Sequence, residues 1–279
     1  MHPVLLQFGP FTIYTYGVLV AAGFLVGLFY AYHHAADAGL DKQEVWNLAI
    51  YGILIGLAAS KIWLVASAWD YYRANPGQIF SIETFESAGT FYGGIVGGAV
   101  WVLLYTHFQK MSLLPVLDLC AAPVALGHAI GRIGCFAAGC CYGKPTTLPW
   151  GVTFTSPIAE KVAGTPLNIR LHPTQLYEAT AEFANFLLLI WLGSHRRSRM
   201  RFPGQLVGAY CILYGIERGA IEFLRDDPGR TMMFHDSVSL MQLVSLALIL
   251  AGAFLWWHGL RREPAIPPAH ATIDSPSPS

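Results

Sequence analysis

Seven long apolar segments constrain the fold of this chain more than any other feature of its sequence. A helix needs about 20 apolar residues to cross the roughly 30 Å hydrocarbon core of a bilayer. Segments of about this length, several interrupted by a glycine or a charge, cover residues 17–35, 46–68, 92–109, 113–131, 176–194, 204–224 and 237–258. Lipid offers no partner for unpaired backbone groups, which favours helices. The sequence therefore predicts an all-α polytopic membrane protein with seven transmembrane helices embedded in a lipid bilayer.

The composition agrees with burial in lipid. The chain is 54% hydrophobic and only 12% charged, whereas soluble domains carry about 25% charged residues. Seventeen basic residues balance seventeen acidic ones, so the basic excess expected of a nucleic-acid-binding protein is absent and no nucleic-acid partner is predicted. Met1, His2 and Pro3 lack the basic region of a signal peptide, so we expect the first apolar segment to remain in the mature protein.

The distribution of basic residues predicts an orientation, because cytoplasmic loops are enriched in Lys and Arg. One side of the predicted bundle carries Lys42, Lys110, Arg196, Arg197, Arg199, Arg201, Arg261 and Arg262. We expect that side to be cytoplasmic, with the N-terminus outside. Residues 1–262 are interpreted as one membrane-embedded catalytic domain, and the Pro-, Ala- and Ser-rich residues 263–279 as a disordered cytoplasmic tail.

A long polar connection separates the fourth and fifth apolar segments. Residues 132–175 contain many Gly, Pro, Thr and Trp residues, and residues 150–154 alternate like a short strand. Connections of this length are commonly either functional or disordered. We predict a small ordered external cap. Further basic residues lie on that side, where the orientation rule does not place them, and we expect some of them to bind an anion; they are Arg73, Lys144, Lys161, Arg170, Arg225 and Arg230.

Ionisable residues inside the apolar segments mark a candidate site, because a charge at the bilayer centre costs about 2.5–3.5 kcal/mol on insertion scales. Tyr214, Arg218 and Glu222 follow one another at four-residue intervals and so share one helical stripe, with Arg225 near its end. One interpretation is an Arg218–Glu222 pair that only orders the helix. The other is a ligand site.

The fourth and fifth segments carry similar signals. Arg132 lies beside glycines, and its planar guanidinium suits bidentate phosphate binding, whereas His128 is interpreted as a structural residue. Lys61 lies within the second segment, with a structural and a substrate-binding role both open. Gln175 and Glu178 share a face with Glu182 near a Pro-initiated helix start. For Glu178, network support and direct catalysis are both open.

Three of the five cysteines, Cys135, Cys140 and Cys141, fall in one short stretch. Their spacing matches zinc and iron–sulfur motifs weakly. A disulfide on the oxidising outer side is a second interpretation, small apolar packing residues a third, and a nucleophilic thiol a fourth.

Several motifs, in the same order along the chain, resemble those of the prolipoprotein diacylglyceryl transferase family. They span about residues 5–258 and comprise Tyr14-Thr15-Tyr16-Gly17, Phe91-Tyr92-Gly93-Gly94, Gly131-Arg132-Ile133-Gly134-Cys135-Phe136, Gly139-Cys140-Cys141-Tyr142-Gly143, Leu148-Pro149-Trp150-Gly151, His172-Pro173-Thr174-Gln175-Leu176-Tyr177-Glu178 and the stretch from Tyr214 to Arg225.

The resemblance implies a bacterial inner-membrane enzyme that moves the diacylglyceryl group of phosphatidylglycerol to the lipobox cysteine of prolipoprotein signal peptides. It implies no metal or organic cofactor. The residues expected to act in catalysis are Arg132, Arg218, Tyr92 and Tyr16. Those expected to bind phosphatidylglycerol are Arg132, Arg218, Lys61, Gly94, Gly143, His172, Gln175, Glu178, Tyr214, Glu222 and Arg225.

The chain departs from the family pattern at four positions. Tyr92 replaces a common histidine, Cys135 an asparagine, Cys140 an acidic residue and Lys61 a common arginine. The identity of the general base is therefore open. Two other functions compete at this point: an anion or lipid transporter that uses the buried arginines, and a membrane thiol oxidoreductase.

Overall fold

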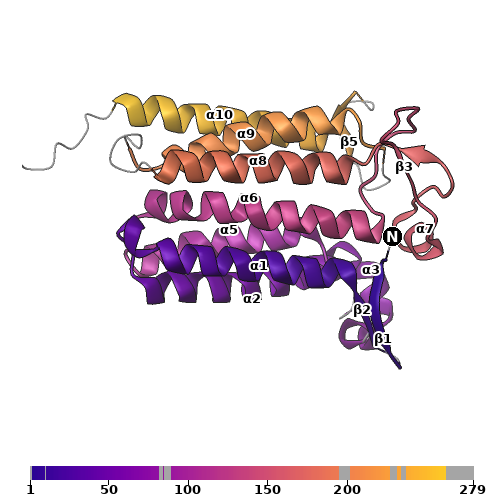
Figure 1. Ribbon diagram of the computed structural model, residues 1–279. Coiled ribbons are helices and arrows are strands. Elements are labelled where there is room, and N and C mark those ends of the chain that lie inside the picture. The colour runs from indigo at the N-terminus through magenta and orange to yellow at the C-terminus, as the bar shows by residue number, and fades with distance from the viewer. Residues whose placement is uncertain are drawn as a thin grey trace, which may run out of the picture.

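Long parallel and antiparallel helices form the body of the protein (Figure 1). The computed structural model describes residues 2–9, 11–81, 84, 89–194, 202–226, 231–233 and 237–261. Among these residues, the helices of 18 residues or more are α1 (Thr15–His34), α2 (Lys42–Ser67), α5 (Phe91–Phe108), α6 (Leu113–Ala138), α8 (Thr174–Ser194), α9 (Gln205–Glu222) and α10 (Leu240–Arg261). Four of them, α1, α2, α6 and α10, are long and apolar enough to cross a membrane. The mostly helical architecture of a membrane protein is thus confirmed.

Short elements gather at one end of the bundle, on the right of Figure 1. They include the helices α3 (Trp69–Ala74) and α7 (Pro157–Ala163), the 3₁₀ helix Pro76–Phe80, and three antiparallel pairs of strands. The pairs are β1 (Val4–Phe8) with β2 (Phe11–Tyr14), β3 (Val152–Thr153) with β4 (Arg170–Leu171), and β5 (Met232–Met233) with β6 (Val238–Ser239). A further 3₁₀ helix, Ala36–Ala38, links α1 to α2. The strand expected within residues 150–154 is confirmed by β3, whereas the other strands were not predicted.

The exterior of the bundle is apolar and several of its most buried side chains are charged. Leu54 and Leu250 are more than half exposed, whereas Glu178, Glu182 and Glu222 are at most 1% exposed. A soluble protein shows the opposite distribution, because ionisable residues are rarely buried and large apolar patches are rarely exposed. An outer surface that contacts lipid accounts for this arrangement.

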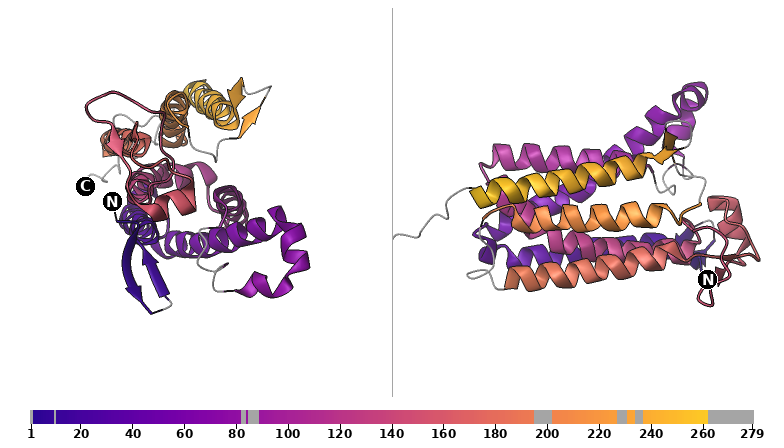
Figure 2. Two further views of the ribbon diagram at one scale, coloured as in Figure 1. Left: turned by 90° about the vertical axis from the view of Figure 1, so that its right-hand side faces the viewer. Right: turned by 90° about the horizontal axis from the view of Figure 1, so that it is seen from above.

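Helix α6 lies in the middle of the bundle and packs against α1, α8 and α9. Seen end-on, the indigo and purple helices lie to one side and the orange and yellow helices to the other (Figure 2, left). The fourth apolar segment was expected to end at residue 131, but α6 continues to Ala138. Residues 132–138, which the sequence analysis assigned to the polar connection, thus form the last two turns of the helix. Gly139 ends the helix in the left-handed conformation (φ +86°), as C-terminal glycines commonly do.

Glycines allow close approach of neighbouring helices, as is common in membrane bundles. Gly252 on α10 faces Gly208 on α9, and a Cβ added at Gly252 would lie 2.5 Å from the Gly208 carbonyl oxygen. Gly23 on α1 faces Gly127 on α6 in a similar way. Backbone atoms form both contacts, so no side-chain rotation can relieve an added methyl group.

We expect Gly252→Ala to destabilise the protein by about 1–3 kcal/mol, the usual cost of overpacking. Gly98→Ala is the matched control, because a Cβ at Gly98 meets nothing within 4 Å. Alanine also favours helix by about 1 kcal/mol over glycine. Thermal unfolding in detergent, followed by circular dichroism, should show a lower midpoint for Gly252→Ala only. Equal midpoints would contradict the role of this contact in packing.

Candidate functional site

A network of charged side chains joins α6 to α8 near the end of the bundle that carries the small sheets. Arg132 Nη2 lies 2.7 Å from Glu178 Oε1, and Arg132 Nε donates to His128 Nε2 at 3.1 Å. His128 Nδ1 lies 2.7 Å from Glu182 Oε1. Because the guanidinium donates to Nε2, a neutral His128 carries its proton on Nδ1 and donates it to Glu182. The prediction of a structural role for His128 is consistent with this bridging position.

Helix α9 contributes two tyrosines to the network. Tyr210 donates its hydroxyl hydrogen to Glu182 at 3.2 Å. The Tyr214 ring meets the His128 ring edge-on, with centroids 5.5 Å apart. Tyr214 was expected at the site from its spacing, whereas Tyr210 was not, although Tyr210 extends the same four-residue spacing by one helical turn.

Helix α9 contributes to two further polar pairs, of which the Arg218–Glu222 pair is buried. Arg218 donates to Glu222 at 2.6 Å, so the ion pair considered in the sequence analysis is present, with the two side chains 5% and 1% exposed. Asn185 on α8 donates to Glu217 at 2.8 Å. Glu217 was missed because it lies off the Tyr214–Arg218–Glu222 stripe.

Side-chain donors fix the loop that follows α6. Three successive carbonyl oxygens accept hydrogen bonds: Gly139 from Thr165 at 2.8 Å, Cys140 from Gln175 at 2.6 Å and Cys141 from Thr174 at 2.7 Å. Gln175, expected to bind lipid, therefore holds this loop in place.

Gly143 lies where the loop meets two other segments. It forms an isolated antiparallel bridge with Arg225, itself buried, and its N–H donates to the His172 carbonyl at 3.0 Å. A Cβ at Gly143 would approach His172 Cβ and the Leu224 carbonyl to 2.7 Å. Only glycine fits this crossing, which brings together three residues expected to bind the lipid, Gly143, His172 and Arg225.

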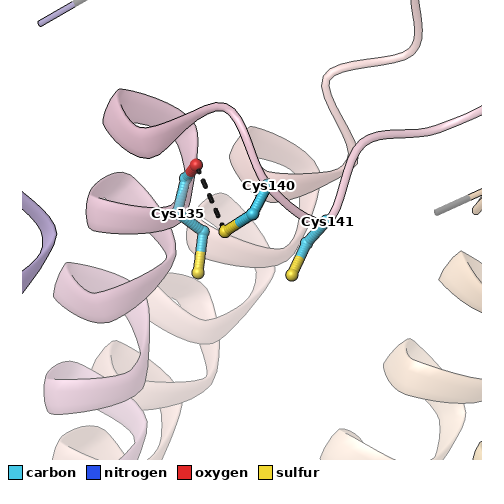
Figure 3. Close-up of side chains that lie close together, drawn as sticks. All are labelled: Cys135, Cys140 and Cys141. Carbon is cyan, nitrogen blue, oxygen red and sulfur yellow. Dashed lines mark hydrogen bonds between the residues drawn. The ribbon is translucent and has the colours of Figure 1, made fainter. Parts of the chain in front are cut away.

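The thiols of Cys135, Cys140 and Cys141 converge. Their sulfur atoms lie within 4.8 Å of one another and point to the same side (Figure 3). All three are free thiols; Cys135 is buried and the other two are partly buried. The pKa of Cys141 is lowered well below its usual value, because the thiols of Cys135 and Cys140 hydrogen-bond to it and because the guanidinium groups of Arg132 and Arg225 favour its thiolate.

Four expected site residues lie on other helices. Lys61 on α2 donates to the Thr84 carbonyl at 2.8 Å, Tyr92 at the start of α5 is 41% exposed, and Gly94 faces Gly56 of α2. On α1, the Tyr16 ring lies against Gly134 of α6, because a Cβ at Gly134 would lie 3.3 Å from Tyr16 Cδ2. Tyr16 thus lies next to the Arg132 region, whereas Lys61, Tyr92 and Gly94 belong to the α2–α5 pair.

A second chain of polar contacts links the connection between α6 and α8 to the start of α8. His172 Nδ1 lies 3.2 Å from the Tyr177 hydroxyl, and Trp150 Nε1 donates to the same hydroxyl at 2.8 Å. Tyr177 and Trp150 were not selected as site residues, although both lie inside motifs that the sequence analysis quoted. His172 is therefore oriented by Tyr177 from within its own motif.

The arginines can bind an anion while they remain paired. A guanidinium has five N–H donors in a planar fork, and the contacts above occupy two groups of Arg132 and one of Arg218. Fixed donors in an environment of low dielectric stabilise negative charge strongly. The arrangement is thus suited to a phosphate group that reaches the polar interior from the lipid.

Comparison with known proteins gives a consistent result. A family model described as prolipoprotein diacylglyceryl transferase matches residues 3–258. A phosphatidylglycerol–prolipoprotein diacylglyceryl transferase of Clostridium tetani is 36% identical over 258 residues, covering 92% of this chain and 97% of its own length. Proteins of the same name from Finegoldia magna and Clostridioides difficile are each 32% identical, over 86% and 85% of this chain and 88% and 87% of their own lengths.

Removing one partner of the Arg132–Glu178 pair should be far more costly than removing both. Glu178→Ala leaves a buried guanidinium without its carboxylate, and we expect a loss of about 3–5 kcal/mol in the free energy of unfolding. Adding Arg132→Met should recover part of that loss. The exposed Glu160 supplies the control, Glu160→Ala, with a change within about 0.5 kcal/mol. Additive losses in the double variant would show that the pair is not coupled.

Proposed function

We propose that this chain, which belongs to the prolipoprotein diacylglyceryl transferase family, transfers the diacylglyceryl group of phosphatidylglycerol to the lipobox cysteine thiol of prolipoproteins. The products are a thioether-linked lipid and glycerol phosphate. The observation that carries the proposal is the buried arginine network of α6, α8 and α9 within an apolar helical bundle. A phosphate attached to a lipid is the anion most readily delivered to that position.

The reaction exchanges a carbon–oxygen bond for a carbon–sulfur bond. The acceptor sulfur attacks the sp³ carbon of the glyceryl group as a thiolate, the form in which cysteine is nucleophilic. The electron pair of the broken C–O bond goes to the phosphate oxygen. The leaving glycerol phosphate therefore gains negative charge, which fixed guanidinium donors stabilise more in the transition state than in the ground state.

We assign the roles within the site from charge and position. Arg132 and Arg218 bind the lipid phosphate, with Glu178 and Glu222 holding the two guanidinium groups in place. Tyr16 and Tyr214 orient the glyceryl headgroup. The remaining residues proposed to bind the substrate are Lys61, Gly94, Gly143, His172, Gln175 and Arg225.

The acceptor thiol must lose a proton, and Tyr92 is one candidate for relaying it. Tyr92 stands where many family members have histidine, as noted above, and the usual tyrosine pKa of about 10 makes it a poor base at neutral pH. His172, oriented by the Tyr177 hydroxyl, is a second candidate. A thiol whose own pKa is lowered by the neighbouring arginines would need neither.

We further propose seven transmembrane spans in the bacterial inner membrane, with the N-terminus outside and the C-terminus in the cytoplasm. Lys42, Lys110 and Arg261 lie at one end of the bundle, whereas the small sheets and α7 lie at the other (Figure 1). This distribution follows the positive-inside rule. The basic cluster Arg196–Arg201, Arg230, Arg262 and the tail 263–279 lie outside the described residues. The connection between α6 and α8 then forms the external cap of one catalytic domain, residues 1–262.

Arg132→Lys and Arg218→Lys should each lower the transfer rate by at least about 100-fold, because an ammonium keeps the charge but loses the bidentate fork. The assay combines purified protein, phosphatidylglycerol and a lipobox peptide, and measures released glycerol phosphate and the lipid-modified peptide. Arg261→Lys is the control, since Arg261 is exposed at the opposite end of the bundle, at the end of α10. Near-normal transfer by either variant would overturn the assignment, provided that both accumulate normally in the membrane.

Tyr92→Phe tests the proton relay separately. If the Tyr92 hydroxyl relays the thiol proton, the variant should lose roughly 10²–10⁴-fold in rate, the usual contribution of a positioned acid or base. The loss should shrink as the pH of the assay rises toward the pKa of the acceptor thiol. Full activity at neutral pH would exclude the hydroxyl and leave His172 or the lowered thiol pKa. Tyr51→Phe, at an exposed position on α2, is the control.

A further inference from the structure

The convergence of three thiols at the end of α6 is not explained by the roles assigned so far. Cys135 lies in the last turn of α6, and Cys140 and Cys141 follow the glycine that ends it. Cys141 adopts a left-handed conformation (φ +61°), which a residue with a Cβ rarely takes and which costs of order 1 kcal/mol. The three sulfur atoms nevertheless lie within 4.8 Å of one another.

This geometry matches the ligand set of a metal ion. A Zn²⁺ ion binds thiolate sulfur at about 2.3 Å with tetrahedral angles, which places its sulfur ligands about 3.8 Å apart. The present separations, all within 4.8 Å, exceed that value by at most about 1 Å. All three sulfurs also point to the same side (Figure 3), so one ion can touch all of them.

The backbone that carries the thiols is held by side chains from outside the loop. Thr165, Gln175 and Thr174 donate to the carbonyls of Gly139, Cys140 and Cys141, respectively. Such outer contacts orient the ligands of metal sites and strengthen metal binding. Two cysteines would suffice for a disulfide, whereas the fixed placement of a third thiol is accounted for by coordination.

The ligand set is incomplete for zinc. Among the described residues, the possible metal-binding group consists of the three cysteines, which offer one sulfur ligand each. Zinc sites with three protein ligands keep the fourth position for an external group. Three thiolates and Zn²⁺ carry a net charge of −1, and Arg132, one turn before Cys135 on α6, supplies compensating positive charge.

We propose that Cys135, Cys140 and Cys141 bind one Zn²⁺ ion and that the thiol of the acceptor cysteine completes its coordination. Each ligand thiol releases its proton to solvent on binding, so the acceptor is held as thiolate without a general base. Its sulfur then forms the S–C bond, the C–O bond breaks toward the phosphate on Arg132, and the neutral thioether leaves the metal. This role of the site rests on the proposed function; metal binding itself does not.

Metal binding is tested first, with the purified full-length protein in detergent and no phosphatidylglycerol. After equilibration with Zn²⁺ and removal of the excess, elemental analysis should give one Zn²⁺ per chain. Cys140→Ser and Cys141→Ser should each lower the affinity by at least about tenfold. Cys120→Ser and Cys211→Ser, which remove the two cysteines outside the cluster, should leave it unchanged. Unaltered Zn²⁺ binding by the cluster variants would overturn the site, and so would a count of three free thiols in unreduced, denatured protein, which indicates a disulfide.

The open position is tested with Cd²⁺, whose bonds to thiolates absorb in the ultraviolet. Adding a lipobox peptide to the Cd²⁺-loaded protein should raise this absorption by about one third, because four thiolates replace three. A peptide with serine in place of the lipobox cysteine should have no effect. An equal response to both peptides, or to neither, would overturn the acceptor's place in the site.

The catalytic role of the Zn²⁺ ion is tested by measuring the rate of diacylglyceryl transfer. Removal of Zn²⁺ by a chelator should slow transfer at least about tenfold, and restoring Zn²⁺ should recover the rate in the wild-type chain but not in Cys141→Ser. Full transfer by the metal-free protein would overturn this role. Absence of transfer from the zinc-loaded wild type, with metal and peptide binding intact, would instead reject the proposed function.

Discussion

The buried ion pair between Arg132 and Glu178 is the contact on which the arrangement of the site depends. Charged groups are expensive to bury, and they are tolerated inside a membrane bundle only when they are paired and hydrogen-bonded. Here the pair at 2.7 Å ties α6 to α8, and His128 extends it to Glu182. Because Glu182 also accepts from Tyr210, α9 is drawn into the same network. One compensated guanidinium thus positions side chains from three helices.

Near its N-terminal end, the central helix α6 also fixes the position of α9. Asp118, early in α6, accepts backbone hydrogen bonds from Gly204 at 2.6 Å and Val207 at 2.9 Å, at the start of α9. A carboxylate there satisfies otherwise unpaired N–H groups and complements the helix dipole. Helices α6 and α9 are therefore joined near both ends, by Asp118 at one and by the His128–Tyr214 contact at the other. This double attachment keeps Arg218 in a defined position relative to α6.

Residue types and spacing were sufficient to select many residues of the candidate site, but not to predict their contacts. Arg132, Glu178 and Arg218 could be selected from sequence because ionisable residues in apolar segments need a reason to be there. Their pairing could not, since Arg132 and Glu178 are distant in the chain and periodicity does not specify which helices are neighbours. The three cysteines were visible in the sequence, but the clustering of their thiols could not be predicted, for a different reason. Its convergence depends on left-handed conformations at Gly139 and Cys141, which residue spacing does not reveal.

The balance of buried charge has a consequence for the proposed reaction. Glu178 pairs with Arg132 and Glu222 with Arg218, so both guanidinium charges are already compensated before any lipid binds. The phosphodiester of phosphatidylglycerol carries one negative charge, whereas the phosphate monoester that leaves can carry two. At low dielectric, the guanidinium groups attract this second charge as it develops, whereas the carboxylates paired with them oppose it. The paired guanidinium groups therefore stabilise the charge on the departing phosphate, while their carboxylates limit how tightly the dianionic product is held, which an isolated cluster of arginines would not do.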